Sequence, residues 1–194
     1  MNDQTWLLIR HAESTWNAED RWQGHGDPPL SDRGRQQAEA LGRRLAGEKI
    51  DVLVSSDLTR AAETAAMLGR VWSLRPLLTE SLRELAVGTW TGLKRDQIEA
   101  LAPETLRRFE ALDPDVHPGG GESRREIRQR ARRAVAELVS AHPGRRLALV
   151  THLGVIRALS ASAASAGGTA GRESEPQPDI THCHSVELVV SRLR

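Results

Sequence analysis

Cationic and titratable side chains follow two short apolar runs that predict buried strands. Leu7–Ile9 leads directly into Arg10 and His11, and Leu147–Val150 is followed after one residue by His152. In an α/β protein the carboxyl ends of the strands face the ligand crevice. A fixed positive charge and an imidazole at that edge are suited to meet an anion. A strand can also end in Arg or His simply because it has reached solvent, so other parts of the chain must decide.

A third junction of the same kind carries Arg60. This residue lies in the first turn of a helix that is predicted to follow the strand Asp51–Ser55. Parallel strands would bring all three junctions to one edge of the sheet, where two arginines and two histidines face one crevice. Together with the backbone N–H groups of helix N-termini, they would form a pocket for a doubly charged oxyanion.

The elements that must position these residues alternate between strand and helix patterns. Strands are predicted at Leu7–Ile9, Asp51–Ser55, within Val71–Leu78, Leu147–Val150 and Ser185–Val190. Helices are predicted from Ser31 to Ala46, from a cap at Ser56 or Asp57 through Leu68, at Arg95–Leu101 and Pro103–Leu112, from Ser123 to Ser140, and from Gly154 onward. This alternation implies right-handed βαβ crossovers and a mostly parallel sheet covered on both faces, which is a three-layer α/β/α sandwich.

Composition and length narrow the class of protein. A chain of 194 residues suits a single domain over 1–194, in which Gly167–Pro178 offers little to bury and is expected to be a flexible loop. With 27 basic and 26 acidic residues, nothing indicates a nucleic-acid partner. The single cysteine, Cys183, fits a reducing compartment. No signal-peptide pattern and no membrane-length apolar run is present, so we expect a soluble, cytoplasmic protein with no membrane partner.

Segments spread over most of the chain resemble the histidine phosphatase superfamily, also called the phosphoglycerate mutase-like family. The matching segments are Arg10–Asn17, Gln23-Gly24 with Asp27 and Pro29–Ser31, Gly34 with Gln37-Ala38, Ser55–Leu58 with Arg60-Ala61 and Glu63-Thr64, Leu82–Leu85 with Gly88, Trp90 and Gly92, Pro118–Ser123, and Val150–His152. They occur in the family's order, which makes the set far more specific than an isolated motif. The resemblance implies a phosphoglycerate mutase-like fold and chemistry on a phosphorylated small molecule.

The resemblance also implies roles for the residues at the crevice. His11 would be the nucleophile that attacks phosphorus and forms a phosphohistidine, which requires a neutral imidazole that nearby cations favour. Arg10, Arg60 and His152 would hold the phosphoryl oxygens and spread their charge in the transition state. Further donors are expected from Asn17, Gln23, Gly24 and the backbone N–H of Leu153.

Glu84 is expected to donate a proton to the leaving alcohol and then to activate water. The alternative interpretation is a surface carboxylate paired with Arg83. The motif around it, which includes Leu82, Trp90 and Gly92, favours the catalytic role.

We predict no metal and no other cofactor, because phosphoryl transfer through histidine has no mechanistic need for a metal. His182, Cys183 and His184 are metal-ligand types, but no complementary pair stands elsewhere at metal spacing. They are expected to lead into the last strand. The expected partner is a small-molecule phosphomonoester, and a homodimer stays open because members of the family are often dimers.

The chain departs from the family pattern in three places. Ala12 and Leu153 stand where glycine is usual or common, and Ser160–Asp179 is rich in Ala, Ser and Gly. The methyl of Ala12 is expected to be tolerated. The side chain of Leu153 is expected to narrow the pocket, while its backbone N–H survives.

Two other functions stay open at this stage. A cofactor-dependent phosphoglycerate mutase would transfer the phosphoryl group, but the interval between Arg60 and His152 is short for a mutase. A catalytically inactive phosphate-binding domain would need the cations but not His11 or Glu84. Hydrolysis of a phosphomonoester is therefore the favoured function.

The substrate itself is not fixed by the sequence. A predicted rim of Arg21, Arg83, Arg124 and Arg125 would suit a second anionic group on the substrate, and solvated surface charge explains it equally well. Trp16, Trp22 and Trp90 either line the mouth of the crevice or fill the core.

Overall fold

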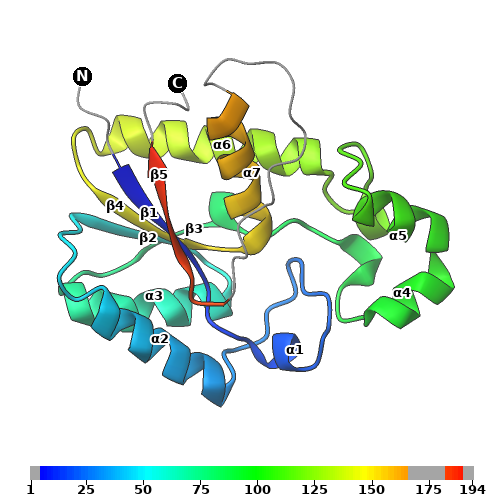
Figure 1. Ribbon diagram of the computed structural model, residues 1–194, viewed down its shortest axis with the longest axis horizontal. Helices are drawn as coiled ribbons and strands as arrows, with labels where there is room; N and C mark the ends of the chain where they lie inside the picture. Colours follow the sequence, from blue (N-terminus) through cyan, green and yellow to red (C-terminus); the bar gives the residue numbers. More distant parts are fainter. Residues whose placement is uncertain (1–4, 166–181, 190–194) are drawn as a thin grey trace.

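The computed structural model describes residues 5–165 and 182–189, and in this part of the chain the strands form a single five-stranded sheet. The strands are β1 (Thr5–Arg10), β2 (Val52–Ser56), β3 (Leu77–Thr79), β4 (Leu147–Thr151) and β5 (Ser185–Val189). Their order is β3-β2-β4-β1-β5, and β5 pairs with β1 in the antiparallel sense while the other pairs are parallel (Figure 1). The predicted mostly parallel sheet is confirmed.

Helices cover both faces of this sheet. They are α1 (Thr15–Ala18), α2 (Asp32–Arg44), α3 (Thr59–Trp72), α4 (Arg95–Leu101), α5 (Pro103–Glu110), α6 (Arg124–Ala141) and α7 (Leu153–Ser165). In Figure 1, α2 and α3 lie under one face and α6 and α7 lie over the other. Helix α1 lies close to the chain that leaves β1, while α4 and α5 lie at the right edge of the view. The predicted three-layer α/β/α sandwich is confirmed.

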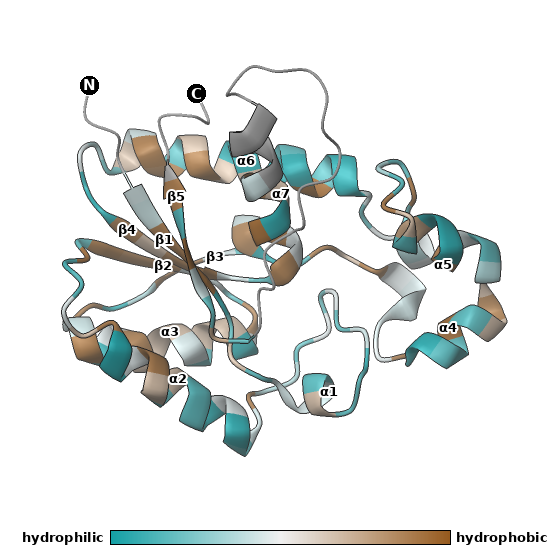
Figure 2. Ribbon diagram, viewed as in Figure 1, coloured by the Kyte–Doolittle hydropathy of each residue, from teal (hydrophilic) through white to brown (hydrophobic). Residues whose placement is uncertain are grey.

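The apolar run of β1 is continuous because both of its faces are buried. Trp6 and Leu8 belong to the core cluster that includes residues of α6 and α7, whereas Leu7 and Ile9 belong to the cluster that includes residues of α2 and α3. Figure 2 shows the same pattern as apolar strands between helices with one polar and one apolar face. Burial on both faces is the usual environment of a parallel strand, and it fixes the position at which β1 gives way to polar residues.

Two of the predicted helix starts are confirmed by their caps. The Ser31 hydroxyl accepts a hydrogen bond from the N–H of Gly34 at 2.9 Å. Ser123 forms a capping box with Glu126, in which each side chain bonds the backbone of the other residue.

The predicted cap of α3 is wrong. Neither Ser56 nor Asp57 caps this helix, because the cap position falls on Leu58, whose side chain makes no capping hydrogen bond. Instead, the N–H of Thr59 donates to Oδ1 of Asp27 at 2.6 Å, so a carboxylate distant in sequence satisfies the helix start. Local sequence cannot show such a partner.

The third strand, predicted within Val71–Leu78, overlaps that segment only at Leu77 and Leu78 and ends at Thr79. Helix α3 continues to Trp72, and β3 begins only after Pro76. Proline has no backbone N–H to donate to a ladder, which explains why pairing starts at the next residue.

Helix α2 approaches the loop that follows His11 very closely. A Cβ added at Gly34 would lie 2.0 Å from the backbone oxygen of Glu13, so only glycine permits this contact.

The predicted loop Gly167–Pro178 lies outside the described residues. Among the helices of residues 5–165, none is long and apolar enough to cross a membrane.

Candidate active site

A cavity of about 390 Å³ opens at the carboxyl ends of β1 and β4. Eight of the nine predicted site residues line it, namely Arg10, His11, Asn17, Gln23, Gly24, Arg60, Glu84 and Leu153. The other residues along its wall are Arg21, Trp22, Leu85, Val87, Phe109, Arg124, Gly154 and Arg157. The structure therefore brings together residues from distant parts of the chain, as the strand-end argument predicted.

His11 follows the last residue of β1 and is 3% exposed. Its Nδ1 lies 2.6 Å from the backbone oxygen of Ala12. A carbonyl oxygen only accepts hydrogen bonds, so Nδ1 carries the proton and Nε2 is the unprotonated nitrogen. Burial, followed by the nearby charge of Arg60, holds the pKa of His11 well below its ordinary value. The ring is therefore neutral at neutral pH.

His152 lies beside His11 without reaching the cavity wall. The two ring centroids are 5.0 Å apart, and His152 is fully buried. Within residues 5–165 and 182–189, neither of its ring nitrogens has a hydrogen-bond partner. Burial, and then the charge of Arg60, lowers the pKa of His152 well below its ordinary value.

Arg60 is held in place by backbone carbonyls. It is 1% exposed, and its Nη1 and Nη2 donate to the oxygens of Gly26 and Gly24 at 2.7 and 2.9 Å. Burial lowers the pKa of Arg60 to about 10, so it remains a cation at neutral pH. Gly24 has φ +48°, and a Cβ there would lie 2.7 Å from the side chain of Val87. The turn that anchors Arg60 therefore requires glycine.

Arg10 has a partner that the sequence reasoning missed. Its Nη2 lies 3.1 Å from Nε2 of His182, which must accept because guanidinium only donates. His182 reaches this position because β5 pairs with β1 and the N–H of Arg10 donates to the oxygen of His184 at 3.0 Å. Burial, and then the charge of Arg10, lowers the pKa of His182 to about 4. The antiparallel pairing of β5 with β1 was not predicted, and the contact between His182 and Arg10 depends on it.

The amides of Asn17 and Gln23 are oriented by Ser14. The N–H of Ser14 donates to Oδ1 of Asn17 at 3.1 Å, and the Ser14 hydroxyl donates to Oε1 of Gln23 at 2.8 Å. Both amide oxygens therefore face Ser14, which leaves the NH₂ donors of two cavity-lining residues available for another acceptor.

The carboxylate of Glu84 is held by backbone N–H groups. Gly154 donates to Oε1 and Oε2 at 3.0 and 3.2 Å, and Leu85 donates to Oε1 at 2.8 Å. Arg83 pairs with Asp57 instead, at 2.8 Å from Nε to Oδ1. The alternative interpretation, a surface pair between Glu84 and Arg83, is therefore wrong.

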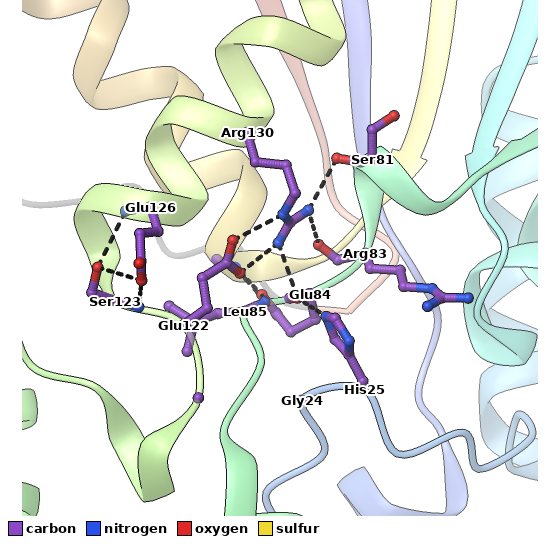
Figure 3. A network of polar contacts seen from close by, with 12 residues as sticks. Gly24, His25, Ser81, Arg83, Glu84, Leu85, Glu122, Ser123, Glu126 and Arg130 are labelled. Carbon is purple, nitrogen blue, oxygen red and sulfur yellow. Dashed lines mark hydrogen bonds and ion pairs between the residues drawn. The ribbon is translucent and has the colours of Figure 1, made fainter.

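Arg130 of α6 clamps the backbone that carries Glu84 (Figure 3). It donates to both carboxylate oxygens of Glu122 at 2.9 and 2.6 Å. It also donates to the backbone oxygens of Ser81, Arg83 and Glu84 at 3.0, 2.8 and 3.2 Å. His25 adds a ring nitrogen 2.8 Å from the same Glu84 oxygen. The segment is thus fixed from two sides, from α6 and from the loop that anchors Arg60.

The predicted arginine rim is only partly correct. Arg21 and Arg124 line the cavity, whereas Arg125 pairs with Asp115 at 2.6 Å and, like Arg83, does not line it. Arg157 and Phe109 also line the cavity and were not singled out from the sequence. Arg83 and Arg125 are paired with Asp57 and Asp115 instead.

The predicted tryptophans divide between wall and core. Trp22 lines the cavity, while Trp90 is 2% exposed and packs edge-on against Trp22 with ring centroids 5.4 Å apart.

In the part of the chain that the structure describes, no group of three or more His, Cys, Asp or Glu residues could hold a metal ion.

The buried histidines predict a pH-dependent stability. Because the pKa values of His11, His152 and His182 are lowered, the unfolded chain binds more protons than the folded chain below about pH 6.5. The free energy of unfolding should therefore fall from about pH 7.5 to about pH 5, by up to about 1.4 kcal/mol per pH unit for each histidine. Urea unfolding at several pH values measures this slope.

The control separates the site from the rest of the chain. His152→Gln should reduce the pH slope of the unfolding free energy, whatever its effect at neutral pH. Gly47→Ala changes no titratable group, and nothing lies within 4 Å of a Cβ there, so it should keep the wild-type slope. An unchanged slope in His152→Gln would contradict the burial of a neutral imidazole.

Comparison with known proteins gives the family. The model of the histidine phosphatase superfamily (branch 1) matches residues 6–188. Phosphoglycerate mutase-like protein 4 of Arabidopsis thaliana is 41% identical over 156 residues, which are 79% of this chain and 68% of that protein. The metal-independent phosphoserine phosphatase of Arabidopsis thaliana is 33% identical over 187 residues, 95% of this chain and 78% of that protein.

A solved structure agrees with these sequence matches. It is a mycobacterial glucosyl-3-phosphoglycerate phosphatase in complex with VO3, with a TM-score of 0.77 and 40% identity, covering 82% of this chain and 81% of that chain. Its fold is thus shared over most of both chains. Several of the relatives of this chain are phosphatases. The chain belongs to the histidine phosphatase superfamily (branch 1).

Proposed function

We propose that this protein hydrolyses a small phosphomonoester through a phosphohistidine on His11, with Glu84 as the proton donor. One observation carries the proposal. The imidazole of His11 is neutral, and its Nδ1–H donates a hydrogen bond to the backbone oxygen of Ala12. Nε2 is therefore the nitrogen left to attack, in a cavity that Arg10 and Arg60 also line. A neutral and oriented nitrogen is what nucleophilic attack on phosphorus requires.

The groups around His11 are suited to bind the phosphoryl oxygens. Arg10 and Arg60 supply fixed positive charge, and the amides of Asn17 and Gln23 supply N–H donors. The ring nitrogens of His152 have no hydrogen-bond partner among the described residues, which supports its role as a further donor or acceptor beside the nucleophile. Donors that are held before the substrate arrives lower the cost of charge development in phosphoryl transfer.

The proposed reaction has two steps. Nε2 of His11 forms a bond to phosphorus as the bond from phosphorus to the leaving oxygen breaks, and the protonated Glu84 gives its proton to that oxygen. The Glu84 carboxylate then takes a proton from water, whose oxygen attacks phosphorus and frees His11 and inorganic phosphate. The nucleophile of the first step and the group that moves the protons are both side chains of this protein, so no proposed step uses a metal.

The first test is hydrolysis by wild type and His11→Ala with EDTA present. Wild type should release phosphate from phosphomonoesters, and His11→Ala should lose about a thousandfold or more of kcat, because the nucleophile is gone. His142→Ala is the control and should stay near wild type.

Two outcomes would contradict the hydrolase. Interconversion of phosphoglycerate isomers without release of phosphate would indicate a mutase. Binding of a phosphomonoester with no turnover of any kind would indicate a catalytically inactive binding domain.

A second test addresses Glu84 through the leaving group. Alkyl phosphates need protonation of the leaving oxygen more than aryl phosphates do, so Glu84→Gln should lower kcat on alkyl phosphates by roughly a hundredfold or more and on aryl phosphates much less. Gly154→Ala should give a weaker form of the same pattern, because the added Cβ would lie 2.3 Å from Oε1 of Glu84 and displace it.

Gly47→Ala is the matched control, since nothing lies within 4 Å of a Cβ at that position. It should leave both activities unchanged. Equal losses on alkyl and aryl phosphates in Glu84→Gln would remove the assignment of Glu84 as the proton donor.

A further inference from the structure

The cavity carries more positive charge than one phosphoryl group can neutralise. Among the described residues that line it, five are arginines and one, Glu84, is acidic. The arginines are Arg10, Arg21, Arg60, Arg124 and Arg157. A phosphomonoester brings a charge of about −2 at neutral pH. An excess of cations therefore remains when a phosphoryl group is bound.

Three of these arginines are accounted for. Arg10 and Arg60 lie close to His11, where the phosphoryl group is proposed to bind. Arg21 pairs with Glu19 at 2.6 Å and donates to the backbone oxygen of Gly92 at 2.8 Å. Arg124 and Arg157 remain, and neither forms an ion pair with a carboxylate of residues 5–165 or 182–189.

The guanidinium of Arg124 is fixed before any ligand binds. It begins α6 directly after the Ser123 cap, and it stacks on the ring of Phe109 with its central carbon 4.2 Å from the ring centroid. Its Nη2 donates to the backbone oxygen of Phe109 at 3.1 Å, and its buried Nε has no partner among the described residues. A stacked, oriented guanidinium loses little freedom when it binds a planar or tetrahedral oxyanion.

Arg157 connects this position to the phosphoryl end of the cavity. It lies on α7 one turn after Gly154, the residue that holds Glu84. The charge of Arg157 lowers the pKa of both Arg10 and Arg124, although burial is the larger cause for each, so Arg157 is within electrostatic reach of both. Two like charges facing one cavity repel each other, and an anion bound between them would relieve that repulsion.

We infer that Arg124 and Arg157 form a second anion-binding subsite in the cavity, and that the preferred substrate is a phosphomonoester carrying a second anionic group, a carboxylate or another phosphate. This inference rests on the proposed function, because it assigns the phosphoryl end of the substrate to Arg10 and Arg60. Arg125 does not belong to the subsite. It is next to Arg124 in sequence, but it pairs with Asp115 outside the cavity.

The test compares pairs of substrates that differ in the second anion. O-phosphoserine and O-phosphoethanolamine differ by a carboxylate, as do 3-phosphoglycerate and glycerol 3-phosphate, while glucose 1,6-bisphosphate and glucose 6-phosphate differ by a phosphate. We expect wild type to favour the member with the second anion in at least one pair, by about tenfold or more in kcat/KM. The pair with the largest ratio distinguishes a carboxylate from a phosphate.

Variants then locate the preference. Arg124→Gln and Arg157→Gln should each lower kcat/KM for the favoured member by about tenfold or more, and should leave its counterpart within about twofold. Arg125→Gln should leave both members of every pair unchanged. The thermal midpoints of the three variants are compared with that of wild type. A folding defect would lower the midpoint and would lower kcat/KM for both members of a pair together.

Two results would overturn the subsite. One is a wild-type ratio near one in all three pairs, and the other is an equal loss on both members of a pair in well-folded Arg124→Gln and Arg157→Gln. Failure of the proposed function looks different, because wild type would then hydrolyse neither member nor p-nitrophenyl phosphate. In that case the subsite is tested by calorimetric binding of the same six compounds to wild type and to the three variants. We then expect about tenfold or more tighter binding of the member with the second anion in at least one pair, and a loss of that preference in Arg124→Gln and Arg157→Gln. Equal affinities within every pair, or equal losses on both members, would overturn the subsite.

Discussion

The site depends on keeping one imidazole neutral and oriented among buried cations. Burial and the charges of Arg60 and Arg10 keep the ring neutral, and the hydrogen bond from Nδ1 of His11 to the oxygen of Ala12 orients it. Helix α3 in turn holds the backbone of Ala12. The N–H of Ala12 donates to Oγ1 of Thr64 at 3.1 Å, and the same hydroxyl donates to the backbone oxygen of Arg60 at 2.7 Å. One turn of α3 thus positions a cation and, through Ala12, the nucleophile. A shift of α3 would disturb both at once.

Arg60 and Glu84 do not pair with each other, because each forms its hydrogen bonds with backbone groups. Arg60 is anchored on the oxygens of Gly24 and Gly26, and Glu84 is anchored on the N–H groups of Leu85 and Gly154. A direct ion pair between them would cancel the charge that a ligand needs. Neutral carbonyl and amide partners hold each charged group without neutralising it, so the electrostatic field in the cavity remains available. Arg130 extends the same principle by clamping three backbone oxygens around Glu84 while Glu122 balances its charge.

Much of this arrangement was predictable from sequence, because parallel strands place their carboxyl ends together. Arg10, His11 and Arg60 reach one cavity for that reason, and the Ser31 and Ser123 caps were visible as local patterns. The contacts that were not predicted are those between residues far apart in the sequence. His182 reaches Arg10 only through an antiparallel edge strand, and Asp27 caps α3 from another loop. The single-domain interpretation, the cytoplasmic location and the homodimer stay predictions.

The most direct test of the central claim is the covalent intermediate. Wild-type protein is quenched at alkaline pH during turnover of a phosphomonoester, and its peptides are analysed by mass spectrometry. We expect phosphate on the peptide that carries His11, lost on acid treatment and absent from His11→Ala, because a phosphohistidine is stable in alkali and labile in acid. Turnover without any phosphate on His11, or with phosphate on another residue, would contradict the assignment of His11 as the nucleophile.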